Sequence, residues 1–142
     1  MPAPHAVQGS KGKAWIEFPR AWIFLGRIEG HYGIEMLAAY IEGMTAALGH
    51  GPATLVFHHW EAMSSYDSKC RKDMTDWTLA RREKIARHHV FVRSKLVAMG
   101  VSTANLLLGG ELITSHVVRA SFDAALAAAL RESGWPGTRQ PG

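Results

Sequence analysis

A stretch in the middle of the chain, residues 53–95, constrains the fold more than any other part. It opens with a nearly continuous apolar run, Ala53–Trp60, which is typical of a strand covered on both faces. A polar connection over 61–67 leads into a basic helix predicted from about Asp67 to Arg87, and a second buried strand is predicted at His89–Arg93. This order makes a βαβ unit, so we expect two parallel strands joined by a right-handed crossover.

The segments on either side add strands and helices to this unit. Two predicted strands, 14–18 and 21–28, flank the turn residues Pro19-Arg20 and are expected to form an antiparallel hairpin. The remaining predicted elements are a helix over 32–48, a helix over 94–108 with Ser94 as its N-cap, a strand over 111–118 and a helix capped by Ser121. The sequence therefore predicts an α/β fold of order β-β-α-β-α-β-α-β-α, with a mixed sheet opened by an antiparallel hairpin and helices packed against it.

The chain length and composition fit one folded domain between two polar ends. Its 142 residues are 47% hydrophobic and 20% charged, which is ordinary for a globular protein with a real core. We expect a domain over 14–133, a flexible leader over 1–13 and a flexible tail over 134–142. No signal-peptide pattern and no membrane-length apolar run are seen, and the single cysteine, Cys70, suits a reducing cytoplasm, where we expect the protein to reside.

Positive charge is concentrated in the same middle stretch. Between Lys69 and Lys95 there are nine Lys or Arg residues against three acidic residues, while the whole chain carries a net charge of +4. Such a cluster either attracts an acidic partner or is simply the solvated face of a helix. A nucleic-acid partner is not expected, because no recognition motif and no alternation of basic and aromatic residues is present.

Two segments carry a resemblance to a known family. These are Phe57-His-His-Trp-Glu61 with Tyr66-Asp67-Ser68, and the run Val92–Gly100. In this element order they resemble STAS domains, named for sulfate transporters and anti-sigma-factor antagonists. The chain looks most similar to the branch related to the sporulation anti-anti-sigma factor, which is often grouped with CRAL-TRIO-type lipid-binding domains.

The resemblance implies a binding domain without catalytic activity or cofactor. In switch-type members the loop after the third strand ends in Asp-Ser-Ser-Gly, and a partner kinase phosphorylates the serine after the aspartate. Asp67-Ser68 match this position, while Lys69-Cys70 depart from the motif. Ser68 is therefore the candidate phosphosite, and a phosphate there would gain from the helix N-terminus. The alternative is plain capping, since Ser64-x-x-Asp67 resembles a capping box.

The expected partner is an anti-sigma factor, a kinase or a similar regulatory protein. Ligand-binding loops of parallel sheets lie beyond the carboxyl ends of the strands, which places the partner surface around the loop after 53–60 and the end of 89–93. The candidate contact residues are Trp60, Glu61, Tyr66, Asp67, Lys69, Arg71, Arg93 and Lys95. The aromatic rings of Trp60 and Tyr66 either anchor the partner or seal the end of the sheet.

Other functions remain open from the sequence. A small ligand or lipid would occupy a pocket lined by Met63, Val97, Met99 and the leucines at 106–108. A small enzyme or a zinc site would use Glu61 with the histidine pairs His58-His59 and His88-His89. One pair cannot supply two ligands from one sheet face, so one histidine from each strand would have to meet across the two neighbouring strands. We expect Cys70 to be a core residue, not a nucleophile. A homodimer would form through the exposed edge of the first hairpin.

Overall fold

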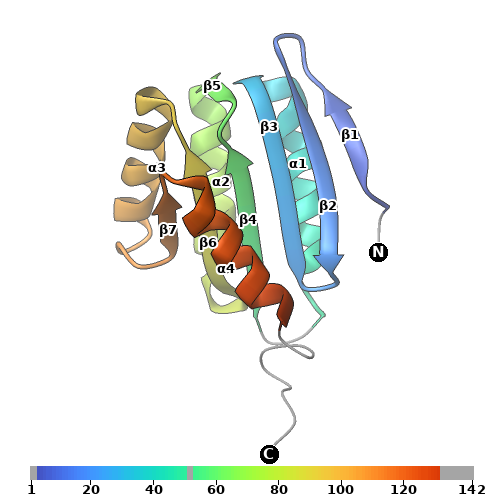
Figure 1. The fold of residues 1–142 in the computed structure, drawn as a ribbon. Helices are drawn as coiled ribbons and strands as arrows, with labels where there is room; N and C mark the ends of the chain where they lie inside the picture. Colours follow the sequence, from blue (N-terminus) through green and yellow to red (C-terminus); the bar gives the residue numbers. More distant parts are fainter. Residues whose placement is uncertain (1–2, 51–52, 132–142) are drawn as a thin grey trace, which may run out of the picture.

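A mixed sheet forms the centre of the fold, with three helices on one face and one on the other (Figure 1). The structure is a computed structural model and describes residues 3–50 and 53–131. The strands are β1 (His5–Gln8), β2 (Gly12–Arg20), β3 (Ile23–Tyr32), β4 (Thr54–Trp60), β5 (Met63–Tyr66), β6 (Ile85–Val92) and β7 (Ile113–His116). Their order in the sheet is β1-β2-β3-β4-β6-β7, and β5 pairs with the end of β3.

The helices are α1 (Ile34–Ala47), α2 (Ser68–Ala80), α3 (Lys95–Leu107) and α4 (Arg119–Arg131). A short 3₁₀ turn, Arg82–Lys84, follows α2. Helices α1, α2 and α3 cover one face of the sheet, and α4 lies across the other face (Figure 1). The N-cap predicted for α3 is confirmed, because the Ser94 hydroxyl accepts a hydrogen bond from the Val97 N–H at 3.3 Å.

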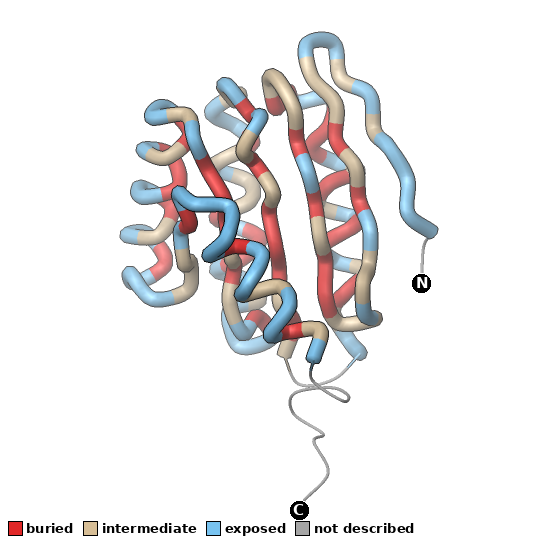
Figure 2. Tube along the Cα trace, viewed as in Figure 1, coloured by how far each residue is buried: buried red, intermediate tan, exposed pale blue. Residues whose placement is uncertain are grey.

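The predicted βαβ unit is confirmed. Strands β4 and β6 pair in parallel, with His58 opposite Val90, and α2 connects them. Strand β4 lies between β3 and β6 in the middle of the sheet, and most of its residues are buried, as the apolar run predicts (Figure 2). The hairpin of β2 and β3 is antiparallel, as expected. The α/β fold class is therefore as predicted, with two strands added to the predicted order.

The first added strand corrects the prediction of a flexible leader. His5–Gln8 form β1, which pairs antiparallel with β2. This strand is short and mostly exposed, so no hydrophobic alternation marks it in the sequence. The predicted first strand, 14–18, is consequently covered by β1 over Ala14–Ile16, and β1 is the outer strand at this end of the sheet. The predicted tail over 134–142 lies outside the described residues.

Other element boundaries also differ from the prediction. The predicted polar connection over 61–67 contains β5, and the predicted helix 67–87 ends at Ala80, because Ile85 joins the buried ladder opposite Thr54. Ser121 does not begin α4. The helix starts at Arg119, and the Ser121 hydroxyl is hydrogen-bonded to the imidazole of His116.

Each face of the sheet has its own core. The larger core lies under α1, α2 and α3 and includes Tyr32, Tyr40 and Trp60. The smaller one lies under α4 and centres on Phe57, Phe91 and Phe122. Because neighbouring strand residues point to opposite faces, the histidine pairs are divided between the two cores.

Candidate functional site

The loops that follow β4 and β6 meet at one end of the sheet, as predicted for carboxyl ends of parallel strands. A hydrogen bond from the Ser94 hydroxyl to the carbonyl of Ser64 in β5, 3.4 Å long, joins the two connections. Helices α2 and α3 both start here, and their first residues, Ser68 and Lys95, are exposed. The candidate phosphosite, Ser68, and the candidate partner-binding residue Lys95 therefore lie at the same end of the molecule.

Glu61 is held by two arginines at this end. Arg93 Nε lies 2.9 Å from Glu61 Oε2, and Arg119 binds the other carboxylate oxygen. Partial desolvation alone would raise the pKa of Glu61, but the hydrogen bond from Arg119 and the charges of Arg119 and Arg93 outweigh it and lower the pKa. A carboxylate held in this way is a poor proton donor, so the arrangement favours a structural ion pair over acid catalysis.

Asp67 occupies the N-cap position of α2, but its side chain caps α1 instead. Its Oδ2 accepts a hydrogen bond of 2.8 Å from the N–H of Ile34, at the start of α1, and within the described chain its side chain makes no capping bond to α2. Its Oδ1 lies 3.0 Å from Nε2 of His31, whose Nδ1 lies 2.7 Å from the Ser65 hydroxyl. The hydrogen bonds from Ile34 and His31 lower the pKa of Asp67. Asp67 thus fixes the loop before α2 against β3 and α1.

The two aromatic residues of the predicted surface lie at different depths. Trp60 is only 8% exposed and donates its indole N–H to the Tyr40 hydroxyl at 3.1 Å, so it seals the sheet end and offers no ring to a partner. Tyr66 is half-buried, and its hydroxyl lies against Gly100 of α3, where a Cβ atom would come within 2.3 Å of it. The close approach of β5 and α3 requires glycine at this position.

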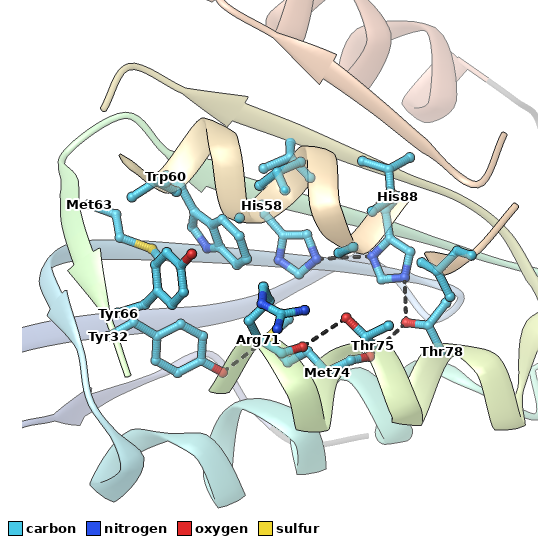
Figure 3. A pocket seen from close by; sticks show the side chains of 17 residues that line it. Tyr32, His58, Trp60, Met63, Tyr66, Arg71, Met74, Thr75, Thr78 and His88 are labelled. Atoms are coloured by element: carbon cyan, nitrogen blue, oxygen red, sulfur yellow. Dashed lines mark hydrogen bonds between the residues drawn. The ribbon is translucent and has the colours of Figure 1, made fainter. Parts of the chain in front are cut away.

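A line of hydrogen bonds runs through the buried core from Trp60. The Tyr40 hydroxyl, which accepts from Trp60, lies 2.6 Å from Nδ1 of His58. Nε2 of His58 in turn lies 3.1 Å from Nδ1 of His88 (Figure 3). The prediction that one histidine of each strand would meet its neighbour across the sheet is therefore confirmed for His58 and His88. Both side chains are buried.

The far end of this line fixes its direction. Nε2 of His88 lies 3.1 Å from the Thr78 hydroxyl, which donates to the Met74 carbonyl at 3.0 Å. A carbonyl can only accept and the Trp60 indole can only donate, so each group between them donates toward Met74. Both imidazoles are then neutral and carry their proton on Nε2. We call this line, from Trp60 to Met74, the buried hydrogen-bond chain.

The protonation state agrees with the depth of the two rings. Burial lowers the pKa of His58 well below its usual value, and the neighbouring His88 lowers it further. Burial also lowers the pKa of His88 to about 4. The buried hydrogen-bond chain thus carries no charge at neutral pH. Each nitrogen of both imidazole rings takes part in one of its hydrogen bonds.

A pocket of about 60 Å³ lies between α2, α3 and the sheet, and His58 and His88 of the buried hydrogen-bond chain line part of it (Figure 3). Of the residues predicted for a lipid pocket, Met63, Val97 and Leu108 line it. Met99, Leu106 and Leu107 do not, because they lie on the outer face of α3 and are exposed. The volume admits a body of a few carbon atoms and not a long acyl chain.

The thiol of Cys70 is buried beside the Tyr32 carbonyl. Burial raises the pKa of this thiol to about 12, helped by the negative charge of Asp67. Since only the thiolate is a strong nucleophile, we expect native protein at about pH 8 to react with Ellman's reagent at least a hundredfold more slowly than urea-unfolded protein. The measurement is the rate of colour release. A native rate close to the unfolded rate would contradict the burial of Cys70.

The second histidine cluster lies on the other face of the sheet, under α4. Nδ1 of His89 lies 3.0 Å from Nε2 of His116, and burial lowers the pKa of His89 to about 4. Because His58 and His88 lie on the opposite face, the four paired histidines do not converge. Among the described residues, no three His, Cys, Asp or Glu side chains are grouped for a metal ion, and no helix is long and apolar enough to span a membrane.

A solved structure of another protein has a fold similar to that of this chain. No protein-family model matches the chain, and no curated protein matches it. Among solved structures, it is similar to one from Shewanella loihica PV-4, described as an uncharacterized protein of the DUF3478 family with a SpoIIAA-like fold. The two are 12% identical and superpose with a TM-score of 0.57, over 87% of this chain and 92% of the other. The chain therefore has a SpoIIAA-like fold, which confirms the STAS-like architecture that its sequence suggests.

Proposed function

We propose that the protein is a regulatory domain that acts by binding another protein and not by catalysis. The SpoIIAA-like fold supports this proposal, because it fits a STAS-type regulatory domain. The expected partner is a regulatory protein of the anti-sigma-factor or kinase type. Its binding surface would run along the outer face of α3 and include the first residues of α2.

One feature carries the proposal, a row of apolar side chains on the outer face of α3. Leu96, Met99, Leu106 and Leu107 are 53%, 68%, 78% and 58% exposed. The opposite face of the helix already packs on the sheet through Val97, Val101 and Ala104, so this row is not needed for the core. Exposed apolar rows of this kind mark interaction sites on soluble proteins.

The basic residues at the start of α3 define the partner further. Lys95 and Arg93 are exposed beside Leu96, and Lys69 is exposed one residue after Ser68. A partner with an apolar patch flanked by acidic residues is complementary to this surface. A phosphate on Ser68 would add about two negative charges next to these cations and weaken such a partner's binding.

The test is affinity capture from the organism that makes the protein. Tagged wild type, Ser68→Asp, Ser68→Ala and Met99→Lys are compared, and bait and partners are identified by mass spectrometry. We expect one regulatory protein to be retained by wild type and Ser68→Ala and reduced at least tenfold by Ser68→Asp and by Met99→Lys.

A control substitution of the same kind is Leu79→Lys, which alters an exposed leucine near the other end of α2. Its capture should equal that of wild type. A partner that is retained by Met99→Lys would show that the α3 row is not the binding surface. A partner lost with Met99→Lys but kept by Ser68→Asp would leave the surface in place and remove the phosphoswitch. Recovery of lipid vesicles instead of protein would replace this proposal with membrane binding.

A further inference from the structure

Arg71 stands out among the arginines of the described chain because its guanidinium has no partner there. Apart from Arg71 and Arg131, each described arginine makes a side-chain hydrogen bond or an ion pair. Arg131 is exposed, whereas Arg71 is half-buried and lines the pocket between α2 and α3. Its side chain extends from α2 on the pocket side (Figure 3). A half-buried cation without a counter-charge favours an anion beside it.

The rest of the pocket offers no competing charge. Its walls are mainly apolar and include Met63, Val90, Val97, Val101 and Leu108. The imidazoles of His58 and His88 also line it, but they are neutral and their nitrogens are used within the buried hydrogen-bond chain. A ligand in this pocket therefore meets mainly apolar surface and, among the lining side chains, the single charge of Arg71.

We propose that this pocket binds a short amphipathic carboxylate. The apolar body would lie between α2 and α3, and the carboxylate would bind the guanidinium of Arg71. The planar fork of guanidinium donors matches the two oxygens of a carboxylate. The pocket volume of about 60 Å³ selects a body of a few carbon atoms. This site is separate from the α3 surface proposed to bind a protein, so either proposal can fail without the other.

The first experiment is a titration of the full-length, ¹⁵N-labelled protein with three probes, followed by amide chemical shifts. Isovalerate supplies a branched body with a carboxylate, isoamyl alcohol supplies the same body without charge, and octanoate supplies a longer chain. We expect isovalerate to give saturable shifts at Val97, Gly100 and Ala104, which lie on the pocket side of α3. The alcohol should bind about tenfold more weakly, and octanoate no more tightly than isovalerate.

Three variants then distinguish the contribution of the Arg71 charge to ligand affinity from that of the apolar pocket. Arg71→Met keeps the length of the side chain and should weaken isovalerate about tenfold while changing the affinity for the alcohol less than twofold. Arg131→Met removes the same charge from a distant surface and should change neither. Ala104→Leu fills the pocket and should abolish binding of both, provided its spectrum shows a folded protein.

Several results would overturn the proposal. No saturable shift with isovalerate would show that the pocket does not take this class of ligand. Equal affinities for isovalerate and the alcohol, or an unchanged affinity in Arg71→Met, would show that Arg71 does not bind the carboxylate. An equal loss in Arg131→Met would indicate a general effect of net charge, and tighter binding of octanoate would remove the size limit.

Discussion

Replacement of Tyr40 by phenylalanine is expected to lower the free energy of unfolding by about 2 to 6 kcal/mol. The hydroxyl of Tyr40 accepts from the Trp60 indole and donates to Nδ1 of His58. Its loss leaves one buried donor and one buried acceptor unpaired, and each costs about 1 to 3 kcal/mol. A tautomer change at His58 cannot repair the loss, because Nε2 of His58 must keep its proton to donate to Nδ1 of His88. The measurement is urea unfolding followed by circular dichroism.

Tyr32→Phe provides a matched control. Tyr32 is also buried, but its hydroxyl donates to the sulfur of Met74 at 3.2 Å, and a thioether is a weak acceptor. The same chemical change should therefore cost less than about 1 kcal/mol there. Equal effects of the two substitutions would show that the hydrogen-bond chain contributes no more than an ordinary buried tyrosine.

The sequence predicts the parts of this structure that depend on local pattern and on strand geometry. The apolar run before Trp60 correctly indicates a central strand, and the parity of His58 and His59 correctly divides them between the two faces. The meeting of His58 with His88 also follows, because parallel neighbours bring side chains of one face together.

The groups at the two ends of the hydrogen-bond chain are not predictable in this way. Tyr40 comes from α1 and Thr78 from α2, and their contacts depend on how each helix is rotated against the sheet. In the sequence, both are only residues of an amphipathic pattern. Gly26 of β3 gives a partial signal, since a Cβ atom there would lie 2.3 Å from the Tyr40 hydroxyl, but a lone glycine in a strand does not name its neighbour.

The candidate site shows the same division. The sequence places Ser68, Lys69, Arg93 and Lys95 at one end of the sheet, where the structure has them exposed. It does not reveal that Asp67 caps α1, because Asp67 and Ile34, whose N–H it accepts from, are 33 residues apart in the sequence. Nor does it distinguish Arg71 from the other basic residues of α2, since the pocket it lines exists only once α2 and α3 are packed.

The second large expected effect is a steep loss of stability in mild acid. The pKa values of His58 and His88 are lowered in the folded protein, in the case of His88 to about 4, whereas unfolded histidine has a pKa of about 6.5. Below about pH 6.5 the unfolded chain therefore binds more protons than the folded one. The stability contributed by the neutral pair is complete above that pH and is lost as the pH falls toward about 4.

The expected slope follows from the number of protons. Two histidines that stay neutral only in the folded state make the unfolding free energy fall by about 3 kcal/mol per pH unit in the middle of this window. His89, on the other face, acts in the same direction. Folded proteins are typically stable by about 5 to 15 kcal/mol, so we expect unfolding without denaturant between about pH 5 and 4.

Two measurements check this prediction together. Urea unfolding at a series of pH values gives the slope, and ¹⁵N spectra of the imidazoles give the protonation state of each ring in the folded protein. His58 and His88 should remain neutral, with the proton on Nε2, until the protein unfolds. The control is His50→Gln, because His50 is exposed and takes no part in the buried hydrogen-bond chain. This substitution should leave the slope of unfolding free energy against pH unchanged. A flat stability profile, or an imidazolium signal from His58 in folded protein near pH 6, would contradict a neutral pair, because either would mean that the folded state binds the protons it is expected to exclude.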